Sequence, residues 1–266
     1  MSLCDEIAEQ RKQLEMSFHN KREKDRNELD QEAFLRKYGN KRFYATAGRS
    51  SAYITEWLRD KCPGAVALDY CCGLGHSSIE IAKLGAFAHG IDISEEEVET
   101  ARRAADQEGL GSRTKFWVMD AENMQFDNDM FDVIVCKGVL HHLDVSKAYP
   151  ELARVLKPGG RILCQEALGY NPLIRLYRKA TPHLRTAWET EHILKLKELA
   201  LARRYFDQIN VRYFHLFSIL AIPLMKTPVF KAALTAFECL DDLILRIPFV
   251  QLLAWQMVFE MSGPRK

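Results

Sequence analysis

The chain has 266 residues, and its 37 Lys and Arg residues nearly balance its 36 Asp and Glu residues, which gives a net charge of +1. This balance argues against nucleic acid as a partner, because phosphate binding is driven by clustered positive charge. The length suits one domain with insertions and a substantial buried core.

The cysteines and the apolar segments indicate the compartment. The seven cysteines show no disulfide-framework spacing, which is typical of small buried residues in a reducing compartment. The N-terminus is charged and lacks the apolar region of a secretory signal. The most apolar stretch, Phe214 to Met225, is interrupted by Pro223 and is much shorter than the ~20 residues that a bilayer requires. We therefore expect a soluble, cytoplasmic protein without stable membrane insertion.

Residues 1–60 are predicted to form a helical arm. Up to about residue 45 the segment is highly charged and helix-prone, with Ile7, Leu14 and Phe18 near one helix face. Such an apolar stripe needs a cover. The helix can pack along the body of the protein with a solvated outer face, or it can act as a lid over an active site or as an arm exchanged between subunits. The stripe favours a homo-oligomer.

Residues 61–266 are predicted to form one α/β domain. Strand and helix signals alternate along them, as in a parallel sheet with helices on both faces. Two segments, at about 169–193 and 218–251, exceed what such a sheet needs. The expected strands are 65–70, 88–93, 115–119, 131–136, 161–165, 209–217 and 254–261, and the expected helices are 51–59, 77–84, 95–107, 145–156 and 194–204.

The turn after the first strand indicates a nucleoside ligand. Gly73 and Gly75 lie between this strand and the next helix, where glycines let the backbone approach a ligand closely. The second strand ends in Asp92, a carboxylate placed to accept hydrogen bonds from a ribose. A dinucleotide is disfavoured, because Ser78 occupies the position of the third glycine of its fingerprint. No Lys or Arg lies in the loop to meet a pyrophosphate.

Asp69-Tyr70-Cys71-Cys72-Gly73-Leu74-Gly75 has the spacing D-x-x-x-G-x-G. It resembles the first motif of the Rossmann-like, class I S-adenosylmethionine-dependent methyltransferases, with Cys71 where that family most often has glycine. The adjacent Cys71 and Cys72 could instead suggest a metal or redox site, but no C-x-x-C or paired His supports one.

The resemblance extends over roughly residues 66–166 through motifs in the family's order. It implies that Asp120 and Ala121 read the adenine, that Lys137 opens a loop beside the cofactor, and that the sheet has seven strands with the last one antiparallel. It implies a cofactor, S-adenosylmethionine, that becomes S-adenosylhomocysteine. The residues that would bind it are Asp69, Cys71, Gly73, Gly75, Asp92, Ile93, Asp120, Ala121 and Lys137.

Four residues are candidates for catalysis. His141 and His142 follow the fourth strand, Glu166 ends the fifth, and Tyr44 belongs to the arm. His is the usual general base near pH 7, and a buried acid must find a partner or a use. His141 and His142 point in different directions if they are helical, so we expect at most one to face the acceptor, and a structural role for either stays open. We find no acidic triad for a metal and expect none.

The bulky content of the two insertions predicts a dry acceptor pocket for a hydrophobic small molecule. Arg175, Arg178, Arg185 and His183 could meet an anionic group there, although a solvated face is favoured. The run from Glu166 to Arg178 resembles natural-product methyltransferases, some of which methylate carbon in prenyl chains. This implies a terpenoid or prenylated acceptor. The alternatives are O- or N-methylation of another small metabolite or a lipid, and a catalytically silent cofactor-binding partner or sensor.

Overall fold

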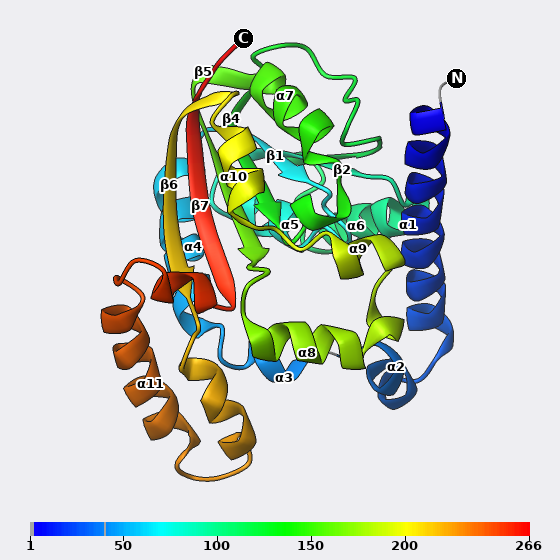
Figure 1. Cartoon of the computed structure of the whole chain (residues 1–266). Helices are drawn as coiled ribbons and strands as arrows, with labels where there is room; N and C mark the ends of the chain where they lie inside the picture. The colour runs from blue at the N-terminus through cyan, green and yellow to red at the C-terminus, as the bar shows by residue number, and fades with distance from the viewer. Residues whose placement is uncertain (1–2, 40) are drawn as a thin grey trace.

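The computed structural model describes residues 3–39 and 41–266. Its centre is a seven-stranded sheet in the order β3-β2-β1-β4-β5-β7-β6, in which β7 runs antiparallel to both of its neighbours (Figure 1). The predicted Rossmann-like fold with an antiparallel last strand is therefore confirmed. The strands are β1 Val66–Tyr70, β2 Phe87–Asp92, β3 Thr114–Val118, β4 Phe131–Lys137, β5 Leu156–Ala167, β6 Phe206–Phe214 and β7 Gln256–Pro264.

The central strands are apolar on both sides because helices cover both faces of the sheet. Along β4, Val133 and Val135 point to one face, and Ile134 and Cys136 point to the other. The first face is covered by α4 (Gly48–Lys61), α5 (His76–Lys83) and α6 (Glu95–Gln107), and the second by α7 (Val145–Val155) and α10 (Leu196–Ala202).

The strand order reverses between β1 and β4. Strands β2 and β3 lie beyond β1 on one side, and β5, β7 and β6 lie beyond β4 on the other. The loops at the carboxyl ends of β1 and β4 diverge there, and they leave a crevice where open α/β sheets bind their ligands. The fold thus places the glycine turn after β1 and the histidine pair after β4 on opposite sides of one crevice.

The predicted arm, residues 1–60, contains α1 (Leu3–Glu28), α2 (Gln31–Tyr38), α3 (Lys41–Tyr44) and most of α4, but α4 packs into the core of the α/β domain, so the name arm is kept for α1 to α3. Residues 1, 2 and 40 lie outside the described residues. Asp30 caps α2 by accepting from the backbone N–H of Ala33. Helix α1 lies beside α6 along one side of the domain (Figure 1). The face that packs is polar: Arg11 and Glu15 are buried, whereas Ile7 and Leu14 are more than half exposed.

The two insertions lie in different places. The first contains α8 (Pro172–Ala180), a 3-10 turn at Pro182–Leu184 and α9 (Ala187–Glu191), and it lies beneath the crevice (Figure 1). The second contains 3-10 turns at Ser218–Leu224 and Val250–Leu253 and the helix α11 (Phe230–Ile244), and it projects away from the sheet. Among residues 3–39 and 41–266, no helix combines the length and the apolar character that crossing a bilayer would require.

Candidate active site

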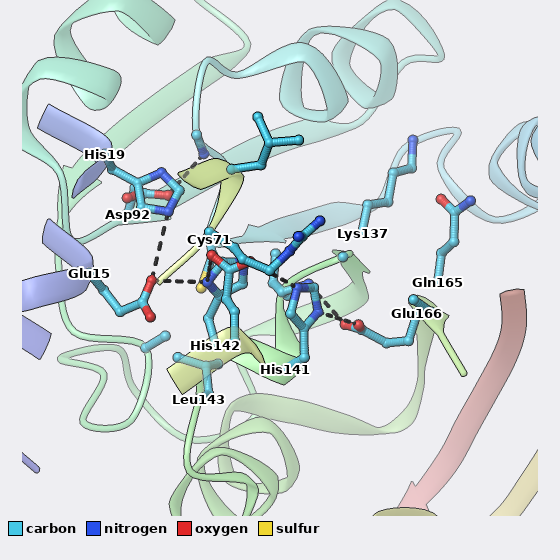
Figure 2. A pocket seen from close by; sticks show the side chains of 18 of the residues that line it. Glu15, His19, Cys71, Asp92, Lys137, His141, His142, Leu143, Gln165 and Glu166 are labelled. Atoms are coloured by element: carbon cyan, nitrogen blue, oxygen red, sulfur yellow. Dashed lines mark hydrogen bonds and ion pairs between the residues drawn. The ribbon is translucent and has the colours of Figure 1, made fainter. Parts of the chain in front are cut away.

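A cavity of about 620 Å³ occupies the crevice. Its walls come from the turn after β1, the ends of β2, β4 and β5, the arm, and the first insertion (Figure 2). Most of the predicted site residues meet there although they are distant in the sequence. Those that line the cavity are Tyr44, Cys71, Gly73, Asp92, Ile93, Asp120, Ala121, Lys137, His141, His142 and Glu166.

The turn after β1 is held against the end of β2. Cys71 and Gly73 both have positive φ, 57° and 49°, so the chain reverses tightly. The N–H of Gly73 donates to Asp92 Oδ2 at 2.9 Å, and the N–H of Ser94 donates to Asp92 Oδ1 at 3.0 Å. Burial raises the pKa of Asp92, and repulsion from Glu97 adds to this effect. The Asp92 carboxylate lies in the cavity wall with backbone donors on both oxygens.

Asp69 and Gly75 differ from the prediction, because neither lines the cavity. Asp69 is buried beneath the turn, where Ser78 donates to it at 2.7 Å, and burial raises its pKa to about 6. Gly75 has φ of 75° and lies so close to α6 that a Cβ would be 2.8 Å from that of Ala101. Both residues shape the turn from behind.

Glu166 organises the loop that follows β4. It is 1 % exposed, and its Oε1 accepts from the N–H groups of Val139 and Leu140 at 2.8 and 2.7 Å. Its Oε2 lies 2.7 Å from His141 Nδ1 (Figure 2). Both oxygens are therefore engaged. With Nδ1 held by Glu166, the other ring nitrogen of His141, Nε2, lies 3.9 Å from Glu189 Oε2.

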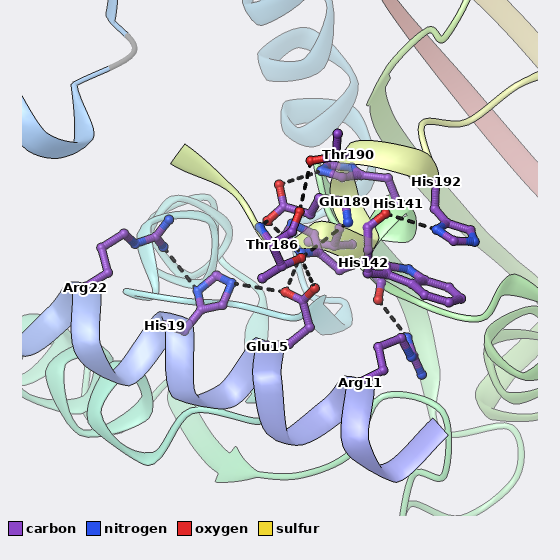
Figure 3. A network of polar contacts seen from close by, with 12 residues as sticks. Arg11, Glu15, His19, Arg22, His141, His142, Thr186, Glu189, Thr190 and His192 are labelled. Carbon is purple, nitrogen blue, oxygen red and sulfur yellow. Dashed lines mark hydrogen bonds and ion pairs between the residues drawn. The ribbon is translucent and has the colours of Figure 1, made fainter. Parts of the chain in front are cut away.

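Both histidines line the cavity, so they do not point in clearly different directions, and the expectation that at most one faces the acceptor stays a prediction. The reason is local: Leu140–His142 forms a short 3-10 turn, and the two rings lie 4.4 Å apart. His142 Nδ1 is 3.0 Å from Glu15 Oε2 and 3.5 Å from Glu189 Oε1 (Figure 3). Two overlapping groups in this network are compact enough to hold a cation, and the prediction of no metal stays a prediction. The groups are Glu15, His19 and His142, and His141, His142 and Glu189.

Comparison with known proteins identifies the domain. Residues 68–164 match the family model described as a methyltransferase domain. Residues 68–164 are a class I, S-adenosylmethionine-dependent methyltransferase domain.

The curated relatives match in the same region. An uncharacterized methyltransferase, YcgJ, from Bacillus subtilis is 33% identical over 127 residues, which cover 47% of this chain and 49% of the relative. A sterol 24-C-methyltransferase from Aspergillus fumigatus is 33% identical over 120 residues, which cover 44% of this chain and 32% of the relative. Methyltransferase GfsG from Streptomyces halstedii is 36% identical over 105 residues, covering 39% and 38%. The match thus spans less than half the length of each of these three relatives.

Solved structures support the methyltransferase fold over most of the chain. Geranyl diphosphate C-methyltransferase from Streptomyces coelicolor A3(2) superposes with a TM-score of 0.55 at 16% identity and covers 81% of this chain and 80% of its own. The [4+2]-cyclase SpnF superposes with a TM-score of 0.52 at 18% identity, covering 82% and 83%. Sequence identities this low show that the fold is shared and show nothing about the function.

The arm supplies a wall of the cavity, which agrees with the predicted alternative of a lid, but apart from Tyr44 the residues that form this wall were not among the predicted site residues. Lys12 Nζ lies 2.6 Å from Asp120 Oδ2, and Arg11 reaches buried Glu122 at 2.5 Å. The signal was present as polar residues at helical spacing: Arg11, Glu15, His19 and Arg22 form one stripe along α1 (Figure 3). Glu189 was also missed, although Thr186 and Glu189 carry the T-x-x-E signature and form a capping box.

Docking of the arm should weaken as the pH rises. Burial is the largest influence and disfavours the charged form of His19, but its hydrogen bond to Glu97 at 3.1 Å and the negative charges of Glu97 and Asp92 together outweigh it, and the pKa is raised above its usual 6.5. Glu15 and Asp92 add negative charge beside it, and Arg22 adds positive charge. Because the raised pKa belongs to the docked state, its stabilisation is full below about pH 6.5 and is lost as the pH passes the raised value.

Hydrogen exchange measures this effect. After correction for intrinsic rates, amide protection in α1 should be higher at pH 6 than at pH 8.5, and His19→Gln should remove the difference. Equal pH dependence in both proteins would contradict the assignment to His19.

Proposed function

We propose that this chain transfers the methyl group of S-adenosylmethionine to a hydrophobic small-molecule acceptor in natural-product biosynthesis, with C-methylation of a prenyl or terpenoid group favoured. The observation that carries the proposal is one continuous cavity that joins a nucleoside-type turn to a histidine–carboxylate pair. The aromatic residues Phe43, Tyr44 and Trp255 line the same cavity.

The cofactor half of the cavity suits the nucleoside. Asp92 lies in the wall as an acceptor for ribose hydroxyls, and Gly73, at a positive φ that favours glycine, has no side chain to block the turn. Asp120 and Ala121 lie beside it in the position that the family resemblance gives to adenine readers. Lys12 of the arm pairs with Asp120 in this structure, so this ion pair has to break before Asp120 can bind an adenine.

The acceptor half suits a reaction that releases a proton. When bound, the sulfonium cofactor supplies an activated methyl group, so the protein mainly aligns the acceptor, which is worth ~7–11 kcal/mol. His141 Nε2 is the ring nitrogen that would take the proton, because Glu166 holds Nδ1, and Glu189 Oε2 lies 3.9 Å from it. Glu166 is then a positioning residue, since both of its oxygens are engaged. Tyr44 and His142 line the same space and would contact the acceptor.

Two relatives favour carbon as the methylated atom. The names of the sterol 24-C-methyltransferase and the geranyl diphosphate C-methyltransferase both specify transfer to carbon of an isoprenoid. A phosphoethanolamine N-methyltransferase from Caenorhabditis elegans, 32% identical over 112 residues, keeps N-methylation as the alternative. The [4+2]-cyclase SpnF has this fold, so a role of this chain without methyl transfer is the other alternative.

The proposal is tested by cofactor binding and an acceptor screen. The folded chain should bind S-adenosylmethionine and S-adenosylhomocysteine with micromolar affinity in calorimetry, and it should transfer labelled methyl to a prenylated, indolic or phenolic acceptor. His141→Asn should keep cofactor binding and lose ~10²–10⁴-fold in transfer. His192→Asn, which changes an exposed histidine of the first insertion, is the control.

Three outcomes separate the alternatives. Transfer in plain buffer supports a small-molecule enzyme, whereas transfer only with liposomes indicates a lipid acceptor. Cofactor binding without transfer to any acceptor supports the silent partner. No binding of either compound by the folded chain would contradict the proposal.

The arm also carries the proposal of self-association. Ile7 and Leu14, whose side chains are 55% and 65% exposed, are the residues that a second copy of the chain would cover. This assembly and a cytoplasmic location remain predictions.

A further inference from the structure

Two arginines of the first insertion are buried in the cavity wall, where a solvated face was expected. Arg178 on α8 is 9% exposed and Arg185 is 8% exposed, and both line the cavity. Arg175 on the same helix and His183 are exposed, and they lie outside the lining. The structure therefore separates these basic residues into a buried pair and an outer pair.

The buried pair lacks acidic partners. Among the described residues, neither guanidinium forms an ion pair with a carboxylate within 4 Å. Arg178 donates through Nη2 to the carbonyl of Glu189 at 2.6 Å, and its buried Nε has no partner. Arg185 uses Nη1 alone, toward oxygens of Arg178 and Thr181. Each guanidinium has five N–H groups, so most of their donors remain free.

The electrostatics agree with this count. Burial lowers the pKa of Arg178, and the positive charge of Arg185 lowers it further. Glu189 and Glu166 act in the opposite direction from nearby, without outweighing the loss of water. Two buried cations side by side are costly unless a negative charge comes between them or beside them.

We propose that Arg178 and Arg185 bind an anionic group, a carboxylate or phosphate, of the acceptor. The inference rests on the proposed function and names the acceptor more closely. The guanidinium fork matches both oxyanions in a bidentate manner. Phe43, Tyr44 and Ile174 line the cavity with this pair and would hold the apolar body of the acceptor. Glu166, the partner of His141, lies near enough for its charge to act on Arg178. The acceptor is thus amphiphilic, with an anion at one end and the methylated group near His141.

The test uses wild-type protein saturated with S-adenosylhomocysteine, so that the carboxylate of the cofactor is already in place. Benzoate, inorganic phosphate and pyrophosphate are titrated in calorimetry, and their ranking distinguishes a carboxylate from a phosphate site. Arg178→Met and Arg185→Met should each weaken binding of the preferred anion by at least tenfold. Arg175→Met, the same change on the outer face of α8, should stay within twofold of wild type.

Arg178→Lys keeps the positive charge but loses the bidentate geometry of the guanidinium, so it should weaken anion binding several-fold. This variant still tests the proposal if the Met variants fold poorly. Absence of anion binding by wild type, or an equal loss in Arg175→Met, would overturn the proposal. A folded Arg178→Met variant that loses S-adenosylhomocysteine itself would also overturn it, because the pair would then serve the cofactor. If wild type binds the anion but not S-adenosylhomocysteine, the anion site stands and the proposed methyl transfer fails.

Discussion

Asp92→Ala is expected to weaken binding of S-adenosylhomocysteine by at least about 100-fold, which corresponds to ~2.8 kcal/mol. The variant removes the carboxylate that would accept from the ribose, and hydrogen bonds to a charged group are worth ~1.5–3 kcal/mol each. It also removes the acceptor of the Gly73 N–H, which holds the turn after β1 in place. Calorimetry of the folded variant measures the loss.

Two control variants separate ligand contact from general damage. Asp92→Asn keeps the shape and one acceptor oxygen, so it should lose less affinity than Asp92→Ala. Asp127→Ala removes an exposed acid outside the cavity lining and should bind as wild type does. An Asp92→Ala protein with unchanged affinity would contradict the assignment of the ribose site.

Glu166→Ala is expected to lower the free energy of unfolding by ~3–5 kcal/mol, because three donors lose their acceptor and each buried donor left without a partner costs ~1–3 kcal/mol. The carboxylate is buried and accepts from two backbone N–H groups and from His141. Its removal leaves these donors without partners in the interior. Urea unfolding followed by circular dichroism measures the change.

The matched variants report the two functions of this carboxylate. Glu166→Gln keeps an acceptor for the backbone of Val139 and Leu140, so it should cost less stability than Glu166→Ala. It should still reduce methyl transfer, because the amide no longer holds the imidazole as a carboxylate does. Glu191→Ala, an exposed acid of α9, is the control. A change below ~1 kcal/mol for Glu166→Ala would show that the loop is held by other contacts.

The sheet and its ligand edge were predictable because their signals are local. A strand such as β4 is buried on both faces and so shows as a continuous apolar run, and the position of Asp92 follows from the end of β2. The largest boundary error is in β5: the strand expected to begin at residue 161 extends back to Leu156, which pairs with Phe131 across a register shift. The chain passes through Pro158 and two glycines, which favour a turn in the sequence, but pairing with β4 overrides that preference. The ends of β6 and β7 also differ from the expected 209–217 and 254–261.

The walls of the cavity were not predictable in the same way. Lys12 and Asp120 are 108 positions apart, and no local pattern relates them. The second insertion was expected to cover the acceptor, yet no described residue of 218–251 lines the cavity. Its Ile219 instead packs behind the wall with Ile174 and Trp255. The sequence also did not predict which basic residues of the first insertion are buried, because this depends on tertiary packing and not on the spacing of residues along the chain.

The Glu15 carboxylate connects the arm to the first insertion, two of the walls of the cavity. Glu15 on α1 contacts His142 after β4 at 3.0 Å and accepts a hydrogen bond from Thr186 of the first insertion (Figure 3). A ligand that favours the docked arm therefore also favours the ordered insertion. Cofactor and acceptor would then be coupled through Glu15, and thermodynamic reciprocity requires each to change the affinity for the other by the same factor.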